Sequence, residues 1–253
     1  MRYLLLICSD GTATPEKAAV MRESVPSWVE ETQGVRLGGH ALAGPETAAT
    51  VRVRNGETLV SDGPFAETKE HVGGFDVLDC ADLDEAIEIA ARHPVSWFHM
   101  VEVRPFAGSW PPSQPPEPWT GPVPLDRPVP AGHRRYVLLP CIDGVPGTDA
   151  EEASIVRDGT AWRQAREDSG AHVFGHHLMN AETATTVRVR DGETLLSDGP
   201  FVETKEFVAG INVLDCASRE EAIELAAAHP IARFHMVEVR PFADDPLGDG
   251  HAE

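Results

Sequence analysis

The chain contains the same ten-residue stretch twice, and this repetition limits the fold more than any other feature. Residues 61–70 read Ser-Asp-Gly-Pro-Phe-Ala-Glu-Thr-Lys-Glu, and residues 197–206 differ only by a valine in place of the alanine. The similarity extends further, because residues 39–107 align with residues 175–243 without a gap and share 49 identities in 69 positions. Repetition of this length indicates two copies of one structural unit. We therefore expect two units with the same fold.

A proline-rich segment separates the two copies. Residues 108–132 contain nine prolines in 25 positions. They show no apolar periodicity, which is typical of an extended spacer with polyproline-II character. We predict a first unit at residues 1–107, a linker at 108–132, a second unit at 133–243 and an acidic tail at 244–253.

Composition argues against several classes of protein. The net charge of −20 is spread over both units, and no basic patch that would bind nucleic acid or an anionic membrane is visible. No run of 18 apolar residues occurs, so no membrane span is expected. The four cysteines have no Cys-x-x-Cys spacing and lie in apolar strand patterns, which favours buried thiols in a reducing cytoplasm over a redox or nucleophilic role.

Each copy has the pattern of a mixed α and β unit. In the first copy, Asn55-Gly56 between alternating strands predicts a β-hairpin. Thr14 and Asp82 are expected to cap two helices, the first of which is kinked at Pro26. The expected strands are 3–8, 35–43, 50–54, 57–60, 72–80 and 98–103, and the expected helices are 15–33 and 82–91.

This order, β-α-β, an inserted hairpin and β-α-β, predicts an α+β, ferredoxin-like sheet with both helices on one face. The other face of such a sheet is uncovered and has to be buried against something. Two sheets packed face to face solve this problem, and the tandem copy supplies the second sheet in the same chain. We therefore predict an intrachain pseudo-dimer of two ferredoxin-like units.

Several stretches present in both copies carry a family resemblance. They are Tyr3-Leu4-Leu5-Leu6, the Thr-Val-Arg-Val-Arg of residues 50–54, the Asp-Gly-Pro-Phe tract of residues 62–70, the helix at 82–91, and Val-Glu-Val-Arg-Pro at 101–105. On these residues the chain resembles the YCII-related family, in the branch named for its Asp-Gly-Pro-Phe motif.

The resemblance implies a dimeric α+β barrel, in which two ferredoxin-like sheets form a closed or half-closed barrel. Relatives of that fold include monooxygenases, isomerases and lyase-like enzymes acting on small organic molecules. Some family members are associated with extracytoplasmic-class sigma factors, and histidine and aspartate pairs are proposed to act in some. The motifs of the fold's haem-binding and isomerase relatives cannot be located in this sequence.

Histidines that recur in both copies are the main candidates for chemistry, because imidazole transfers protons near neutral pH. The histidine at the end of the second helix, His93 or His229, is explained by the helix dipole. Asp62 and Asp198 are either turn-forming residues or carboxylates that orient a histidine or act as a base. The arginines of residues 50–54 and 186–190 are expected to be solvated. The residues that we predict to act in the two clefts are His40, Asp62, His99, His176, Asp198 and His235.

No spacing of ligands supports a metal site, and no glycine-rich nucleotide motif is present, so neither a metal nor a cofactor is expected. The main prediction is a cytoplasmic protein that binds an unknown small molecule, with acid–base catalysis as an open question. The alternative is a non-catalytic interaction module that regulates a sigma factor. A further homodimer of the whole chain is compatible with both.

Overall fold

A computed structural model describes residues 1–12, 14–66, 70–108, 119–144, 148–201 and 206–244. The Glu-Thr-Lys part of each repeated motif, most of the first half of the linker and the tail beyond residue 244 therefore lie outside the described residues. Both copies of the repeat contain the expected alternation of strands and helices.

The first copy consists of six strands, two helices and two short 3-10 turns. Its elements are β1 (Arg2–Ser9), α1 (Pro15–Glu31), β2 (Arg36–Ala41), η1 (Pro45–Thr47), β3 (Ala49–Arg54), β4 (Glu57–Asp62), β5 (His71–Asp79), α2 (Leu83–Arg92), η2 (Pro94–Trp97) and β6 (Met100–Pro105).

The second copy repeats this order. Its elements are β7 (Arg134–Ile142), α3 (Asp149–Asp168), β8 (His172–His177), η3 (Ala181–Thr183), β9 (Thr185–Arg190), β10 (Glu193–Asp198), β11 (Phe207–Val208), β12 (Gly210–Cys216), α4 (Arg219–Ala228), η4 (Pro230–Arg233) and β13 (Met236–Pro241).

Local sequence signals explain where these elements begin and turn. The Thr14 hydroxyl accepts a hydrogen bond from the Lys17 backbone N–H, and Asp82 accepts one from that of Glu85 at 3.0 Å, so both predicted caps are present. Asn55 has a φ of 54° and the following Gly56 a φ of 81°, the conformation that a two-residue hairpin turn requires. Asp191 and Gly192 form the same turn in the second copy.

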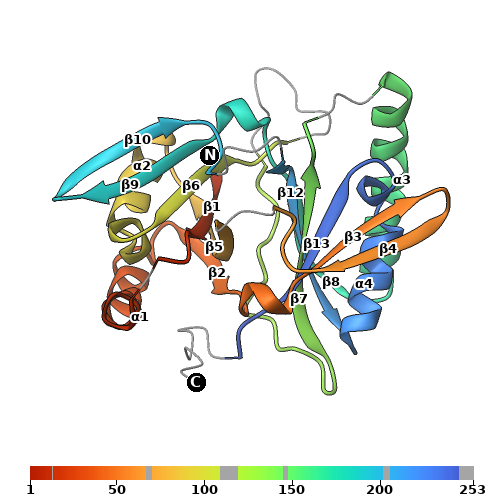
Figure 1. Cartoon of the computed structure of the whole chain (residues 1–253), viewed down its shortest axis with the longest axis horizontal. Coiled ribbons are helices and arrows are strands. Elements are labelled where there is room, and N and C mark those ends of the chain that lie inside the picture. Colours follow the sequence, from red (N-terminus) through yellow and green to blue (C-terminus); the bar gives the residue numbers. More distant parts are fainter. Residues whose placement is uncertain (13, 67–69, 109–118, 145–147, 202–205, 245–253) are drawn as a thin grey trace.

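The two sheets exchange their hairpins. One sheet has the order β10-β9-β6-β1-β5-β2 and the other the order β4-β3-β13-β7-β12-β8. The hairpin β3–β4 of the first copy therefore extends the sheet of the second copy, and β9–β10 extends the sheet of the first (Figure 1). The expectation that each hairpin belongs to its own unit is corrected by this topology.

The position of β2 explains the exchange. Strands β2 and β6 lie on opposite sides of β5 and β1, so a hairpin that follows β2 would have to cross the whole sheet to reach β6. The edge of β13 is closer, because Leu42 forms a bridge with Phe242 and the Ala43 N–H donates to the Pro241 carbonyl. The chain thus enters the other sheet within a few residues.

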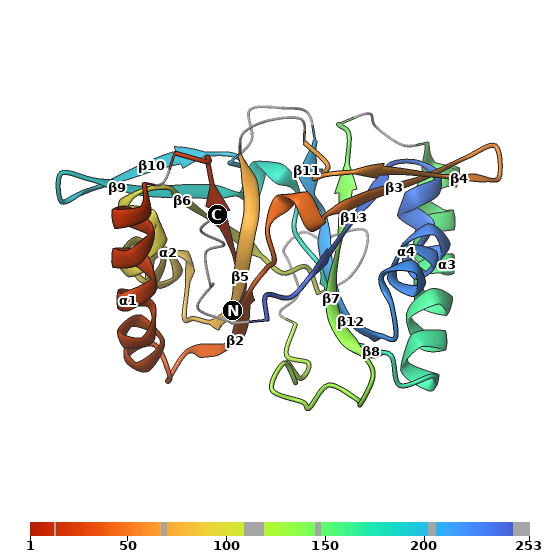
Figure 2. The ribbon, with the colours of Figure 1, turned by 60° about the horizontal axis from the view of Figure 1, so that its bottom comes forward.

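Three apolar clusters divide the molecule into layers. One cluster contains residues from the inner faces of both sheets, including Leu4 and Phe75 from one and Leu139 and Val213 from the other. The two remaining clusters join the outer faces to the helices, α1 and α2 on one side and α3 and α4 on the other. The sheets thus lie between two pairs of helices, as Figure 2 shows. Trp119, near the middle of the linker, packs on Phe174.

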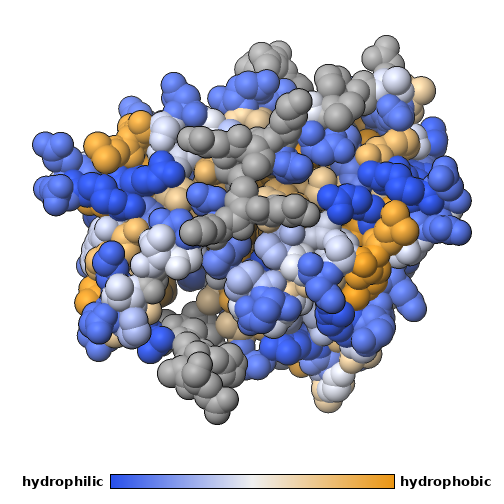
Figure 3. Space-filling model, viewed as in Figure 1, coloured by the Kyte–Doolittle hydropathy of each residue, from blue (hydrophilic) through white to orange (hydrophobic). Residues whose placement is uncertain are grey.

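The surface seen in Figure 3 is mainly hydrophilic, with small separate hydrophobic patches. The exposed aliphatic side chains include Leu59 and Val60 on β4 and their counterparts Leu195 and Leu196 on β10. Among the described residues, no helix combines the length and the apolar character needed to cross a membrane.

Candidate functional site

The six residues predicted to act in the clefts do not meet in one cavity. His40 and His176 lie on the second strand of each copy, where the His40 ring packs against Phe242 at 4.5 Å between centroids. His176 packs in the same way against Trp119, also at 4.5 Å. Burial lowers the pKa of both imidazoles, to about 4 for His176.

His99 and His235 form a second type of contact, with aspartates that sequence reasoning did not select. The Nδ1 atom of His99 lies 2.8 Å from an Asp10 carboxylate oxygen, and that of His235 lies 3.0 Å from Asp143. Burial raises the pKa of Asp10, but hydrogen bonds from Thr12 and His99 outweigh this and hold it below its ordinary value. Each copy therefore has an Asp–His pair at the end of its first strand.

Asp62 and Asp198 lie far from such pairs, at the ends of the exchanged hairpins. The Asp62 side chain is 89% exposed and contacts Arg219 at 3.2 Å, and Asp198 is also exposed. Their carboxylates do not orient His40 or His99. Whether any of the six residues takes part in chemistry stays a prediction, but the geometry separates them into three different locations.

A concave site of the first copy lies between α1 and the outer face of its sheet. The cavity has a volume of about 440 Å³, which falls within the roughly 300–1,000 Å³ range of small-molecule sites. Its walls are mostly apolar and include Met21, Val25 and Trp28 of α1. The polar side chains in the lining are few, which is the usual composition of a site for a small organic molecule.

Asp76 is the central polar group of this cavity. It is buried at 5% exposure on β5, and its Oδ1 accepts a hydrogen bond from Arg36 Nε at 2.6 Å. Its Oδ2 lies 3.8 Å from His93 Nε2. Burial raises the pKa of Asp76 to about 6, although the positive charge of Arg36 opposes the shift. A carboxyl group that ionises so close to neutrality can both accept and donate a proton at physiological pH.

The imidazole of His93 is held in one neutral tautomer. The Val95 backbone N–H donates to His93 Nδ1 at 3.2 Å, so the ring proton is on Nε2, the atom that faces Asp76. Burial lowers the pKa of His93 to about 3, and Arg36 adds to this effect. His93 is therefore a neutral N–H donor beside the carboxylate. From the sequence, His93 was explained by the helix dipole, and that explanation does not include its contact with Asp76.

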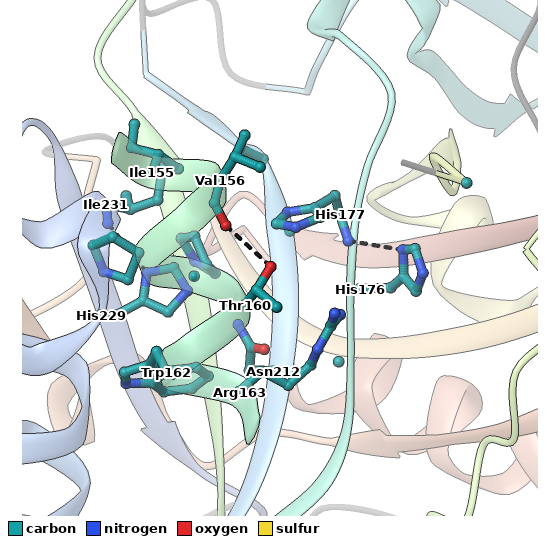
Figure 4. Close-up of a pocket in the computed structure, with 17 residues that line it drawn as sticks. Ile155, Val156, Thr160, Trp162, Arg163, His176, His177, Asn212, His229 and Ile231 are labelled. Carbon is teal, nitrogen blue, oxygen red and sulfur yellow. Dashed lines mark hydrogen bonds between the residues drawn. The ribbon is translucent and has the colours of Figure 1, made fainter. Parts of the chain in front are cut away.

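The corresponding cavity of the second copy has different polar groups. It lies between α3 and its sheet, has a volume of about 170 Å³, and is shown in Figure 4. Among its lining residues, Asn212 replaces Asp76 and His177 replaces Ala41. In Figure 4 the His177 side chain points toward α3, whereas that of His176 points to the other side of the strand. The bulk of His177 in place of a methyl group helps to explain the smaller volume.

The repeated motif itself contacts the opposite copy. The Phe65 backbone N–H donates to a carboxylate oxygen of Glu238 at 2.9 Å, and Glu238 also binds Arg240. The Arg240 guanidinium donates to the carbonyl of Val72, the residue before the glycines that line the first cavity.

The hairpin arginines are partly exposed, but Arg54 and Arg190 also bind the opposite copy, which the expectation of solvated side chains did not include. Arg54 donates to the backbone carbonyls of four consecutive residues of the other copy, residues 232–235. Arg190 makes equivalent bonds to the carbonyls of Ser96, Phe98 and His99. An alternating strand pattern cannot reveal this, because the partners come from the opposite copy.

Metal and thiol chemistry find little support in the described part of the chain. No group of three His, Cys, Asp or Glu side chains within it could hold a metal ion. The four cysteines are free and buried, and burial raises the pKa of each thiol. A thiol that stays protonated is a poor nucleophile.

The residues missed by sequence reasoning had a signal in the repeat. Most of the aligned positions are identical, so the few substitutions that change charge stand out. Asp76 against Asn212 is one of them, and these two residues line equivalent cavities. Asp10 and Asp143 recur directly after the first strand and could have been found as a conserved pair within the chain.

The fold and its cavities define a class of protein: two α/β units with facing sheets, each with a cavity beneath its first helix. The chain belongs to the YCII-related domain family, since residues 1–107 and 137–244 each match that domain. The double match supports a tandem duplication. The chain is also similar to an uncharacterised protein of Rhizobium meliloti (strain 1021), with 40% identity over 117 residues that cover 42% of this chain and 93% of that protein.

Proposed function

We propose that the protein binds a small, mainly apolar organic molecule in the cavity of its first copy and transfers a proton to or from it. Asp76 is the proposed base and acid, and the Nε2–H of His93 is the proposed hydrogen-bond donor. The observation that carries this proposal is a buried carboxyl with a pKa of about 6 in the wall of an apolar cavity of about 440 Å³. His40 also lines this cavity, whereas Asp62 and His99 are not among its lining residues.

The geometry favours abstraction of a proton next to a carbonyl group. The ionised carboxylate would take the proton from carbon, and the neutral imidazole would donate a hydrogen bond to the carbonyl oxygen as negative charge develops there. Arg36 keeps part of the carboxyl population ionised at neutral pH, because its positive charge opposes the effect of burial. Apolar side chains of α1 form one wall of the cavity.

Cyclohexanone is a suitable probe, because it combines an apolar ring with one carbonyl group. Binding is measured from the methyl resonance of Met21, which lines the cavity. Exchange of the ring protons next to the carbonyl is followed in D₂O. We expect a saturable shift of the Met21 signal and exchange above the buffer rate, lost in Asp76→Asn. Equal exchange rates for wild type and Asp76→Asn would refute the catalytic role.

Reciprocal substitutions test the site itself. Ala41→His introduces the larger residue of the second copy, and should weaken cyclohexanone binding about tenfold or more by filling the cavity. His177→Ala is the matched control in the other copy and should leave the Met21 response unchanged. If both variants respond alike, the probe does not bind in the first cavity.

We also infer that the chain is an intrachain counterpart of a dimer, in the Asp-Gly-Pro-Phe branch of the family. The exchanged hairpins and the two equivalent Phe–Glu contacts support this inference. Four free, buried thiols are in keeping with a reducing compartment such as the cytoplasm.

A further inference from the structure

The cavity of the second copy has fewer charged groups than that of the first, whose lining includes Arg22, Arg36 and Asp76. Arg163 of α3 is the one residue with a full charge at neutral pH among the described residues that line it. In the first cavity the equivalent sheet position holds the Asp76 carboxyl, whereas here it holds the neutral amide of Asn212. Duplication has therefore left two cavities of the same origin that suit different ligands.

The neutral groups of the lining supply hydrogen-bond donors. The Ile231 N–H donates to His229 Nδ1 at 3.3 Å, so the neutral ring carries its proton on Nε2. The Asn212 amide offers two N–H groups. Figure 4 shows Asn212, Arg163 and His177 near one another, between α3 and the sheet. Such a set of donors around one cation is suited to an anion with several oxygens.

The histidines around Arg163 are neutral at physiological pH, mainly because they are buried. Burial lowers the pKa of His172, His176 and His177 to about 4, and the charge of Arg163 contributes to the shift of each. The field of the guanidinium therefore extends across the strand that forms one wall of the cavity. The same field would stabilise a negative charge there.

One carboxylate lies nearby but leaves the arginine available. Glu167 Oε1 is 4.0 Å from Arg163 Nε and 3.9 Å from His172 Nδ1, and both the Glu167 and Arg163 side chains are partly exposed. Exposed pairs at this distance contribute little energy, so a bound anion can compete with Glu167.

We propose that the cavity of the second copy is a binding site for a small oxyanion, held by Arg163, Asn212 and His229. The volume of about 170 Å³ restricts the ligand to the size of a phosphate ion or a short carboxylate. This site makes no use of Asp76, so it stands independently of the function proposed for the first cavity.

Inorganic phosphate and acetate, each titrated at constant ionic strength, are the probes. Binding is measured by calorimetry, and the site is identified from the imidazole ¹⁵N resonances of His229 and His177. Arg163→Gln should weaken binding at least tenfold, and Asn212→Asp, which restores the carboxylate of the first copy, should abolish it. Arg163 lies on a partly exposed helix surface, so its substitution should not unfold the protein. Unfolding temperatures check this for both variants.

Arg22→Gln is the matched control, because it removes the same charge from the helix that lines the first cavity. Saturable binding of one anion, with affinity retained in Arg22→Gln and lost in Arg163→Gln, would establish the site. A preference for phosphate or for acetate would then define the oxyanion class. Binding that is not saturable, or that weakens equally in Arg22→Gln and Arg163→Gln, would overturn the proposal.

Discussion

The carboxylate of Glu238 accepts a hydrogen bond from the backbone N–H of Phe65, 2.9 Å away, although the two residues belong to different copies of the repeat. Glu102 and Phe201 repeat this contact at 2.8 Å. Both glutamates are buried and paired with an arginine two residues further along the strand. The most recognisable motif of the sequence is therefore a contact between the two copies.

Replacing Glu238 with glutamine should strongly destabilise the protein. The substitution leaves the Arg240 charge buried without its partner, and breaking a buried ion pair in this way costs about 3–5 kcal/mol. The free energy of unfolding in urea measures the loss. Glu102→Gln is the equivalent change in the other copy and should cost a similar amount, whereas Glu57→Gln on the exposed hairpin strand should change little. A loss below about 1 kcal/mol for both buried glutamates would contradict the account of this contact.

Replacing Arg54 with alanine should also destabilise the exchanged hairpin. Arg54 donates to the backbone carbonyls of four residues of the second copy, and hydrogen bonds from a charged group contribute about 1.5–3 kcal/mol. We expect a loss of about 2–3 kcal/mol and a similar loss for Arg190→Ala. Hydrogen exchange of the β3–β4 amides should increase in the first variant and not in the second. Unchanged exchange in both would mean that these bonds do not hold the hairpins.

The buried histidines should make the protein less stable in acid. His93 and His229 have pKa values of about 3 because burial disfavours the imidazolium, against an ordinary value of 6.5. Between these values the unfolded chain binds more protons than the folded one. The contribution of these histidines to the free energy of unfolding is thus complete above about pH 6.5 and is lost as the pH falls toward 3. For each histidine, the free energy of unfolding falls by up to about 1.4 kcal/mol per pH unit.

The raised pKa of Asp76 acts in the opposite direction over part of this range. Its folded pKa of about 6 lies above the ordinary value of 3.8, so its contribution weakens stability as the pH rises from about 4 to 6.

The His93→Asn variant keeps an acceptor for the Val95 N–H and should reduce the loss of stability between about pH 6 and pH 4. Urea unfolding at several pH values tests this, and an unchanged pH dependence would contradict the assignment of a neutral His93.

The cysteines should be inert in the folded protein. Cys8 and Cys141 are fully buried, and burial raises the pKa of their thiols well above the ordinary value. A thiol reagent should therefore react with them only at the rate at which the protein opens, and completely in denaturant. Rapid reaction of either residue under native conditions would show that this part of the core is accessible.

Much of the fold could be predicted from local signals. The helix caps Thr14 and Asp82, the Asn55-Gly56 turn and the apolar run of β1 each depend on residues close in sequence. The exchange of hairpins could not be predicted, because identical copies of β6 and β13 offer the same edge to either hairpin. The choice between them depends on which edge lies nearer to the end of β2, and this is a property of the packed sheets.

The candidate site was harder to predict, for a related reason. Recurrence of a residue in both copies selected His40 and His99, but recurrence also marks residues that maintain the fold. Asp76 was missed because its copy is Asn212, so the same criterion rejected it. Its proposed role depends on burial beside Arg36 and His93. Asp76 and these two residues come from three different parts of the first copy. The proposed role of Asp76 therefore rests on a difference between the copies and not on their identity.

The central claim, that Asp76 is a proton-transferring group of the first cavity, is tested most directly by its own titration. The side-chain carboxyl resonances are followed by ¹³C NMR as the pH changes, and the Asp76→Asn variant identifies the signal. The account predicts a carboxyl that titrates near pH 6 in the wild type and is missing in the variant. A midpoint at or below the ordinary aspartate value of 3.8 would contradict it, because Asp76 would then be a permanently charged partner of Arg36.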